Sequence, residues 1–111
     1  MTEKRIFELH AEVCKTLSNP LRLQIINELQ EGEKAVSSLT KALGVRQANL
    51  SQHLAVLRQR GVLATRREGP NVYYRIANPK IVKACNLIRQ VLLEQLQSNQ
   101  SIIADVKRLR K

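Results

Sequence analysis

The chain has 111 residues, so we expect one domain covering residues 1–111. Lys and Arg number 19 and Asp and Glu number 9, which gives a formal net charge of +10. This charge favours a polyanionic partner, because basic side chains that bind phosphates release condensed counterions. Aromatic residues make up only 3% of the chain, which argues against single-strand or RNA binding through base stacking.

The composition also argues against a membrane anchor. No uninterrupted apolar run approaches the roughly 20 residues that span a bilayer. Residues 2–5 lack the apolar core of a signal peptide. We therefore expect a cytoplasmic protein with no membrane partner. Two cysteines in such a chain do not make a structural disulfide framework.

Two helices are predicted at the start of the chain. In residues 3–17, apolar and weakly polar side chains recur at helical spacing. Ser18-Asn19-Pro20 ends this helix and starts a second one, because Asn19 can cap it and Pro20 suits the first helical position. The second helix is mostly apolar and ends at Gly32. Glu8, Glu12 and Lys15 are expected to face outward, and the residues that recur at helical spacing are Ile6, Leu9, His10, Val13, Cys14 and Leu17.

A helix-turn-helix is predicted at about 37–60. Its first helix is expected to be capped by Ser37 or Ser38 and to end at Gly44. Its second helix runs from about Gln47 to Arg60. The residues of this helix that face inward are Leu50, Leu54 and Leu57.

A small basic hairpin, which we call the wing, is predicted at about 62–76. Its strands, 62–68 and 72–76, are joined by the turn 68–71, in which glycine supplies backbone freedom and proline fixes one dihedral angle. Tyr73 and Tyr74 point to opposite faces, so one of them is expected in the core. The predicted fold is mainly α with a small β-hairpin, a winged helix-turn-helix.

The C-terminal part is predicted to be helical. Asn78-Pro79 repeats the cap-plus-proline start and opens a long helix at about 79–97, whose apolar residues cover more than one face. A polar stretch, 97–100, follows. Residues Ile102, Ile103, Val106 and Leu109 then allow a last short helix with a basic end at 107–111.

Several spaced blocks of the sequence resemble the ArsR/SmtB family of winged-helix repressors. They are LSNPLRLQII (17–26), LGV (43–45), NLSQHLAVLR (49–58), GVL (61–63), REG (67–69) and VYYR (72–75). Together they cover roughly residues 8–96. The resemblance implies a homodimer joined mainly through the first and last long helices, at about 3–17 and 79–97. It also implies repression of the protein's own operon, with DNA released when a metal or an oxidant alters the dimer.

The predicted base-reading side chains lie in the first turns of the second helix of the helix-turn-helix. They are Gln47, Asn49, Ser51 and Gln52. Gln and Asn can pair bidentately with adenine, and Ser can address several base edges. The alternative is an ordinary solvated helix face. Arg22, which belongs to a matched block, is interpreted as structural.

Four arginines and one histidine complete the predicted DNA site. Arg46 stands where the family usually has a small capping residue, so it is either a phosphate contact or a poor cap. His53 either touches phosphate or serves packing. Arg66, Arg67 and Arg75 of the wing can bind phosphate or enter a narrow minor groove, the alternative being a charged exposed hairpin. The predicted partner is double-stranded DNA with a palindromic operator.

Cys14 and Cys85 are the predicted sensor. They lie on the first helix and the long C-terminal helix, which pack together at the dimer interface in the family that the chain resembles. Some members of that family respond to oxidants or reactive sulfur through two cysteines on comparable helices. Lys15 and Lys83 are sequence neighbours of the thiols and would favour the thiolate. The alternative is that both cysteines are small core residues.

No cofactor or metal is predicted. Segment 35–39, where many metal-sensing members place Cys-x-Cys, has no thiol, and the long C-terminal helix has no histidine. Two alternative functions stay open: a metal- or arsenite-responsive repressor, and an architectural DNA-binding protein that uses the basic tail 107–111. We predict no enzymatic activity, because the chain shows no phosphate-cradling glycine loop, no paired carboxylates in an apolar run and no Ser/His/Asp set.

Overall fold

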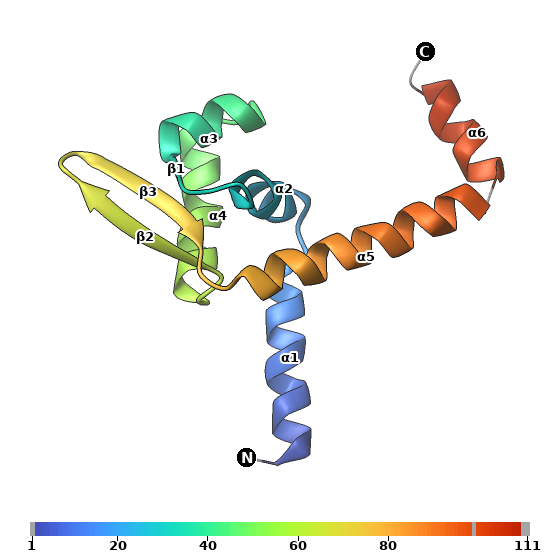
Figure 1. The fold of residues 1–111 in the computed structure, drawn as a ribbon, viewed down its shortest axis with the longest axis horizontal. Helices are drawn as coiled ribbons and strands as arrows, with labels where there is room; N and C mark the ends of the chain where they lie inside the picture. The colour runs from blue at the N-terminus through green and yellow to red at the C-terminus, as the bar shows by residue number, and fades with distance from the viewer. Residues whose placement is uncertain (1, 99, 110–111) are drawn as a thin grey trace.

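The computed structural model describes residues 2–98 and 100–109, which form helices and a small antiparallel sheet that projects from one side of the molecule (Figure 1). The helices are α1 (Glu3–Leu17), α2 (Pro20–Leu29), α3 (Val36–Leu43), α4 (Gln47–Gln59), α5 (Pro79–Ser98) and α6 (Gln100–Leu109). The strands are β1 (Lys34–Ala35), β2 (Leu63–Glu68) and β3 (Asn71–Ile76), in the order β1-β3-β2. The predicted fold class is confirmed. Residues 110 and 111 of the predicted basic tail lie outside the described residues.

Asparagine caps begin two of the helices, as the sequence predicts. The Asn19 side-chain oxygen accepts hydrogen bonds from the backbone amides of Leu21 (2.9 Å) and Arg22 (3.1 Å), and Pro20 occupies the first turn of α2. Asn78 accepts a bond of 3.0 Å from the amide of Lys80 at the start of α5. These bonds satisfy amides that have no partner inside the helix, so they fix where each helix begins.

The start of α3 differs from the prediction. The helix begins at Val36 after Ala35, and no side chain caps it, so neither Ser37 nor Ser38 is the cap. The reason is strand β1, which the sequence did not predict: Ala35 pairs with Tyr73 of β3, and the chain passes directly from this strand into the helix. The end of α3 is confirmed, since Gly44 adopts the left-handed conformation (φ +65°) that glycine tolerates without strain.

The core lies between α2, α3, α4, the start of β2 and α5. The three leucines predicted to face inward from α4 are fully buried, which fixes the rotation of that helix about its axis. Tyr74 packs against this core, as expected for one of the two tyrosines. The buried apolar residues are Ile25, Ile26, Leu29, Leu39, Leu50, Leu54, Leu57, Val62, Leu63 and Cys85.

The wing is a regular antiparallel hairpin. Leu63 pairs with Ile76 at its base and Glu68 pairs with Asn71 at its tip, so only two residues, Gly69 and Pro70, form the loop. Gly69 has φ +60°, the positive value that the first position of a type II′ turn requires. The tight loop fixes the register, and therefore which arginines share a face.

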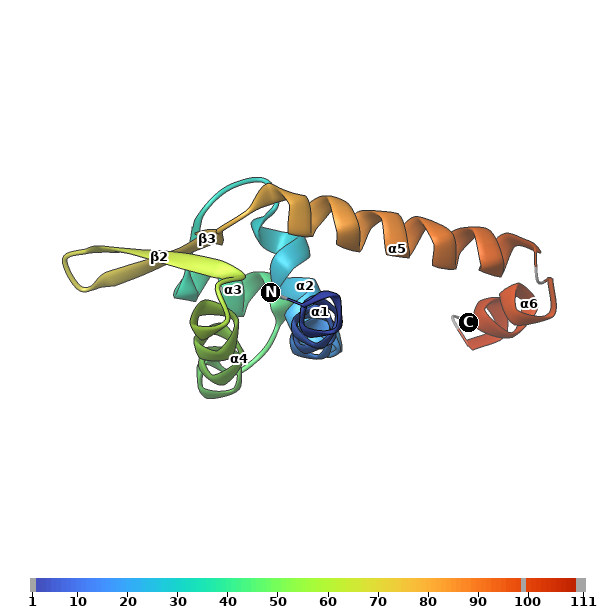
Figure 2. The same cartoon turned by 90° about the horizontal axis from the view of Figure 1, so that it is seen from below.

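Two long helices leave the packed body in different directions. In Figures 1 and 2, α1 and α5 both extend away from the helix-turn-helix and the wing, and α6 turns at the far end of α5. Both helices expose large apolar side chains, which in α1 are Ile6, Phe7, Leu9 and Val13, and in α5 are Leu87, Ile88, Val91, Leu92 and Leu93. Clusters of exposed large apolar side chains mark interaction sites. Within the described ranges, every helix is too short or too polar to cross a membrane.

Candidate nucleic-acid interface

The first half of α4 carries an exposed polar surface. Gln47, Asn49, Ser51 and Gln52 are all exposed, whereas Leu50, Leu54 and Leu57 have no accessible surface. Burial of that leucine stripe turns Gln52 directly outward and places Asn49 and Ser51 on its flanks, while Gln47 is exposed as the first residue of the helix. The structure brings together the residues that the sequence singled out as base readers.

The N-terminus of α4 has no side-chain cap. Arg46 occupies the capping position with an extended backbone (φ −71°, ψ 142°), and its side chain makes no capping bond. The first turn of the helix contains no acidic residue. Free amides and the positive end of the helix dipole both attract anions. Arg46 is thus a poor cap, and it is an exposed arginine at the end of a helix whose free amides suit a phosphate.

His53 differs from its neighbours on α4 because it is half-buried and already bonded. Its Nδ1 accepts a hydrogen bond of 3.1 Å from Nε of Arg22 on α2. Arg22 also donates from Nη1 to the carbonyl oxygen of Thr16 on α1, at 3.0 Å. The interpretation of Arg22 as a structural residue is supported, and its link to α4 is a contact that the sequence did not reveal.

The arginines of the wing occupy two different faces. The strand register places Arg66 and Arg75 on one face together with Tyr73, because alternate residues of a strand share a side. Arg67 lies on the other face, which at the base of the wing includes Leu63 and packs toward α4. Of the three, Arg67 is therefore the one on the side of the wing that packs toward α4.

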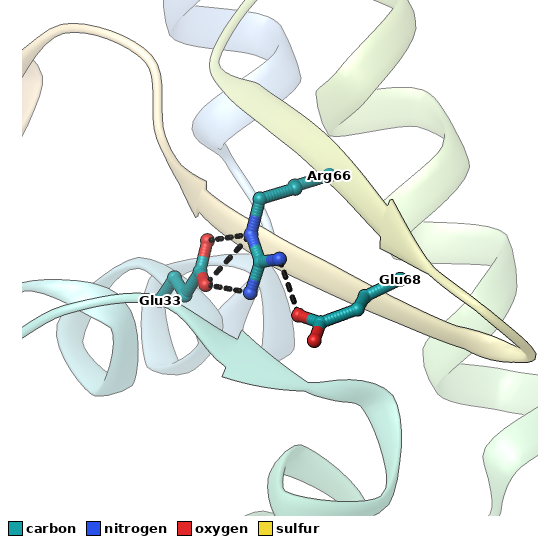
Figure 3. A network of polar contacts seen from close by, with 3 residues as sticks. All are labelled: Glu33, Arg66 and Glu68. Atoms are coloured by element: carbon teal, nitrogen blue, oxygen red, sulfur yellow. Dashed lines mark hydrogen bonds and ion pairs between the residues drawn. The ribbon is translucent and has the colours of Figure 1, made fainter.

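Arg66 is held by two carboxylates in the isolated chain (Figure 3). Glu33, in the segment before β1, accepts bonds from Nη2 (2.5 Å) and Nε (3.0 Å) of Arg66, and Glu68 accepts one from Nη1 (2.6 Å). The guanidinium also lies 4.6 Å from the ring centre of Tyr73. The bond from Arg66 lowers the pKa of Glu33, and the two carboxylates raise the pKa of Arg66. Arg75, on the same face of the wing, also lowers the pKa of Glu33, so two carboxylates and two arginines lie together here, which the sequence did not predict.

The two cysteines are free and lie in different environments. Cys14 is exposed on α1, and Cys85 is buried in the core on α5. Burial raises the pKa of Cys85, and Arg89 opposes this only in part. The expectation that Lys83 favours a Cys85 thiolate was wrong, because the loss of hydration on burial outweighs the one opposing charge, that of Arg89. In the described part of the chain, no three His, Cys, Asp or Glu side chains gather to hold a metal.

A helix-turn-helix with an exposed polar second helix and an antiparallel wing defines a winged helix-turn-helix DNA-binding protein. Residues 19–65 match the family model described as "Bacterial regulatory protein, arsR family". An HTH-type transcriptional regulator of Mycobacterium tuberculosis is 36% identical over 108 residues, which cover 96% of this chain and 95% of that protein. The chain belongs to the arsR family of bacterial regulatory proteins, and is a transcriptional regulator and not an enzyme.

Two further relatives carry functional names. The biofilm growth-associated repressor of Xylella fastidiosa is 39% identical over 93 residues, which cover 84% of this chain and 81% of the repressor. The solution structure of a homodimeric winged helix-turn-helix DNA-binding domain from Mycobacterium bovis has a TM-score of 0.77 and 33% identity, and the match covers 89% of this chain and 94% of that domain. These comparisons confirm the resemblance that the spaced sequence blocks indicated.

Proposed function

We propose that the protein is a homodimeric repressor that binds a palindromic DNA operator through α4 and the wing, in the cytoplasm. The observation that carries this proposal is the exposed polar N-terminal half of α4, which three fully buried leucines hold outward. Gln52, Asn49 and Ser51 read base edges, while Gln47 and Arg46 contact the groove entrance and the phosphates. Such short side chains can donate and accept within a major groove.

The dimer forms through the apolar surfaces of α1 and α5. Each protomer leaves Phe7 of α1 and Ile88 of α5 more than half exposed, at 64% and 70%. A two-fold axis buries the same patch on both copies, and the named relatives include a homodimeric winged helix domain. Two recognition helices then meet half-sites about one DNA turn apart, which is why the operator is palindromic.

Operator binding tests this proposal directly. A gel shift with the DNA upstream of the gene should show a preference of about 10³ or more over random DNA at physiological salt. An architectural protein would bind both DNAs with similar affinity, and that outcome would refute the repressor. Addition of zinc or arsenite to the same reactions tests the metal-responsive alternative.

The wing contributes mainly through Arg67. Arg67→Ala should weaken binding to operator and random DNA alike and lower the slope of log K against log salt by about one, because one phosphate contact is lost.

Glu33→Gln should strengthen binding to both DNAs, because it removes one of the negative charges that bind the Arg66 guanidinium. Glu31→Gln is the matched control, because Glu31 is exposed and its substitution removes the same charge without breaking a bond to Arg66. Equal effects of Glu33→Gln and Glu31→Gln would show that Arg66 is not restrained by Glu33.

The inducing signal acts on Cys14 and Cys85. Exposed Cys14 reacts first: its thiolate attacks hydrogen peroxide to give a sulfenic acid and hydroxide. The Cys85 thiol then attacks that sulfur, forms a disulfide and releases water. With inorganic polysulfide, the Cys14 thiolate instead cleaves a sulfur–sulfur bond, takes up a short sulfur chain and releases a shorter polysulfide, and the Cys85 thiol then attacks an inner sulfur of that chain and releases hydrogen sulfide. Because Cys85 is buried, either link pulls α5 out of its packed position. That movement changes the spacing of the two recognition helices.

The cysteine proposal predicts a redox-dependent gel shift. Peroxide or polysulfide should weaken operator binding by wild type by about tenfold or more, and a reductant should restore it. Cys14→Ser and Cys85→Ser should bind in the reduced state and fail to respond. Oxidised wild type that binds as tightly as the reduced protein would contradict the switch, with the repressor itself unaffected.

A further inference from the structure

Arg22 joins three helices at one point. It lies in the first turn of α2, donates from Nη1 to the carbonyl oxygen of Thr16 in the last turn of α1, and donates from Nε to Nδ1 of His53 in α4. All three residues are wholly or partly shielded from solvent. A guanidinium is a planar fork of donors, so a single arginine can fix both partners at once.

The carbonyl of Thr16 needs a donor from outside its helix. In a continuing helix it would accept a bond from the amide four residues later, but that residue is Pro20, which has no amide hydrogen. Thr16 is also the buried polar residue of this region, with 6% of its surface exposed, so water does not readily replace the missing donor. Arg22 supplies it, and thereby fastens the end of α1 to α2.

The bond to His53 fixes the state of the imidazole ring. An arginine donates and never accepts, so Nδ1 of His53 must be the unprotonated nitrogen. In the neutral ring the proton is then on Nε2. The same bond sets the orientation of the ring beside Gln52, on the helix whose neighbouring side chains are exposed to DNA.

We infer that Arg22 is a positioning residue for DNA recognition, which ties the end of α1 to His53 and so fixes how α4 is presented to the operator. This inference rests on the proposed DNA-binding function. It assigns to α1, otherwise a helix that projects from the body, a hydrogen-bonded connection to α4 through Arg22 of α2. A change in the position of α1 within the dimer is transmitted to α4 through the Arg22 side chain.

The first test needs neither DNA nor a variant. The chain has two histidines, so the ¹⁵N chemical shifts of the rings can be assigned to His53 and His10 without ambiguity. With both rings neutral, His53 should be locked in the Nε2–H form, while exposed His10 shows the averaged pattern of two tautomers. An Nδ1–H form of His53 in wild type would overturn the inference whatever the DNA-binding results.

The second test is a double-mutant cycle on operator binding. Arg22→Met and His53→Ala should each weaken specific binding by about tenfold, and the double variant should be no weaker than either alone, because both remove the same connection. Arg22→Met should also release the His53 ring to the averaged pattern and shift the carbonyl carbon of Thr16. Losses that multiply in the double variant would contradict the connection.

Arg60→Met is the matched control. Arg60 also links α4 to α1, through an exposed ion pair of 3.8 Å with Glu12. Its replacement removes the same charge, but exposed ion pairs contribute little, so the operator affinity should change by less than about threefold and the His53 signals should not change.

If Arg22→Met weakened binding to random and specific DNA equally and left the His53 ring signals unchanged, Arg22 would be a phosphate contact. If wild type showed no operator preference but a locked His53, the repressor would fail and the link would stand.

Discussion

Replacing Gln52 with alanine is expected to weaken operator binding by about ten- to a hundredfold while leaving binding to random DNA near the wild-type value. Gln52 is exposed on the face of α4 opposite the buried leucine stripe, so its amide is free to pair with an adenine edge. A bidentate base contact of this type contributes about 1–3 kcal/mol of discrimination. Fluorescence anisotropy with operator and scrambled duplexes at several salt concentrations measures both quantities. The salt slope should stay unchanged, because glutamine neutralises no phosphate.

Gln59→Ala provides the matched control for this experiment. Gln59 is exposed on the same helix, but lies seven residues, or about two turns, after Gln52 on nearly the same face. The N-terminal part of a recognition helix contacts base edges, so the loss at Gln59 should be much smaller. An equal loss on both DNAs for Gln52→Ala would remove Gln52 from the base readers. A larger loss at Gln59 would mean that α4 enters the groove by its other end.

Local sequence signals predicted the elements well because their causes are local. The two Asn-Pro pairs fix the starts of α2 and α5 through bonds to amides two or three residues away. Gly44 ends α3 through its own positive φ, and the spacing of leucines in α4 sets which face is buried. A helix face and its cap can be predicted from neighbouring residues alone, so the polar surface of α4 was predictable.

The features that the sequence did not reveal depend on residues far apart in the chain. Strand β1 has only two residues and forms because β3 pairs with it. Two residues are too few for an alternating pattern, so the sequence could not predict this strand. The partner of Arg66 is Glu33, in the segment before β1, and that of His53 is Arg22, on a different helix. The burial of Cys85 likewise depends on how α5 meets the core. The charge around Arg66, the tautomer of His53 and the thiolate character of Cys85 therefore depend on the fold and not on the neighbouring residues in the sequence.

Replacing Ile88 with glutamate should convert the proposed dimer into monomers and weaken operator binding by at least about a hundredfold. Ile88 is 70% exposed, so the change leaves the protomer core intact. At the two-fold interface it would bury two unpaired carboxylates, which is strongly unfavourable. A monomer carries one recognition helix and loses the gain that comes from binding the second half-site from the same molecule. Sedimentation velocity gives the oligomeric state, and the anisotropy assay gives the affinity.

Gln90→Glu is the charge-matched control for the dimer prediction. Gln90 is exposed two residues further along α5, on nearly the opposite face from Ile88, so it adds the same negative charge away from the side of the helix that carries Ile88, Val91 and Leu92. This variant should remain dimeric and bind the operator within about threefold of wild type. Circular dichroism of both variants verifies that the fold is retained, since Ile88 packs on nothing in the protomer core. A stable Ile88→Glu dimer would place the interface elsewhere, and a monomer with undiminished operator affinity would show that one α4 and one wing are enough for recognition.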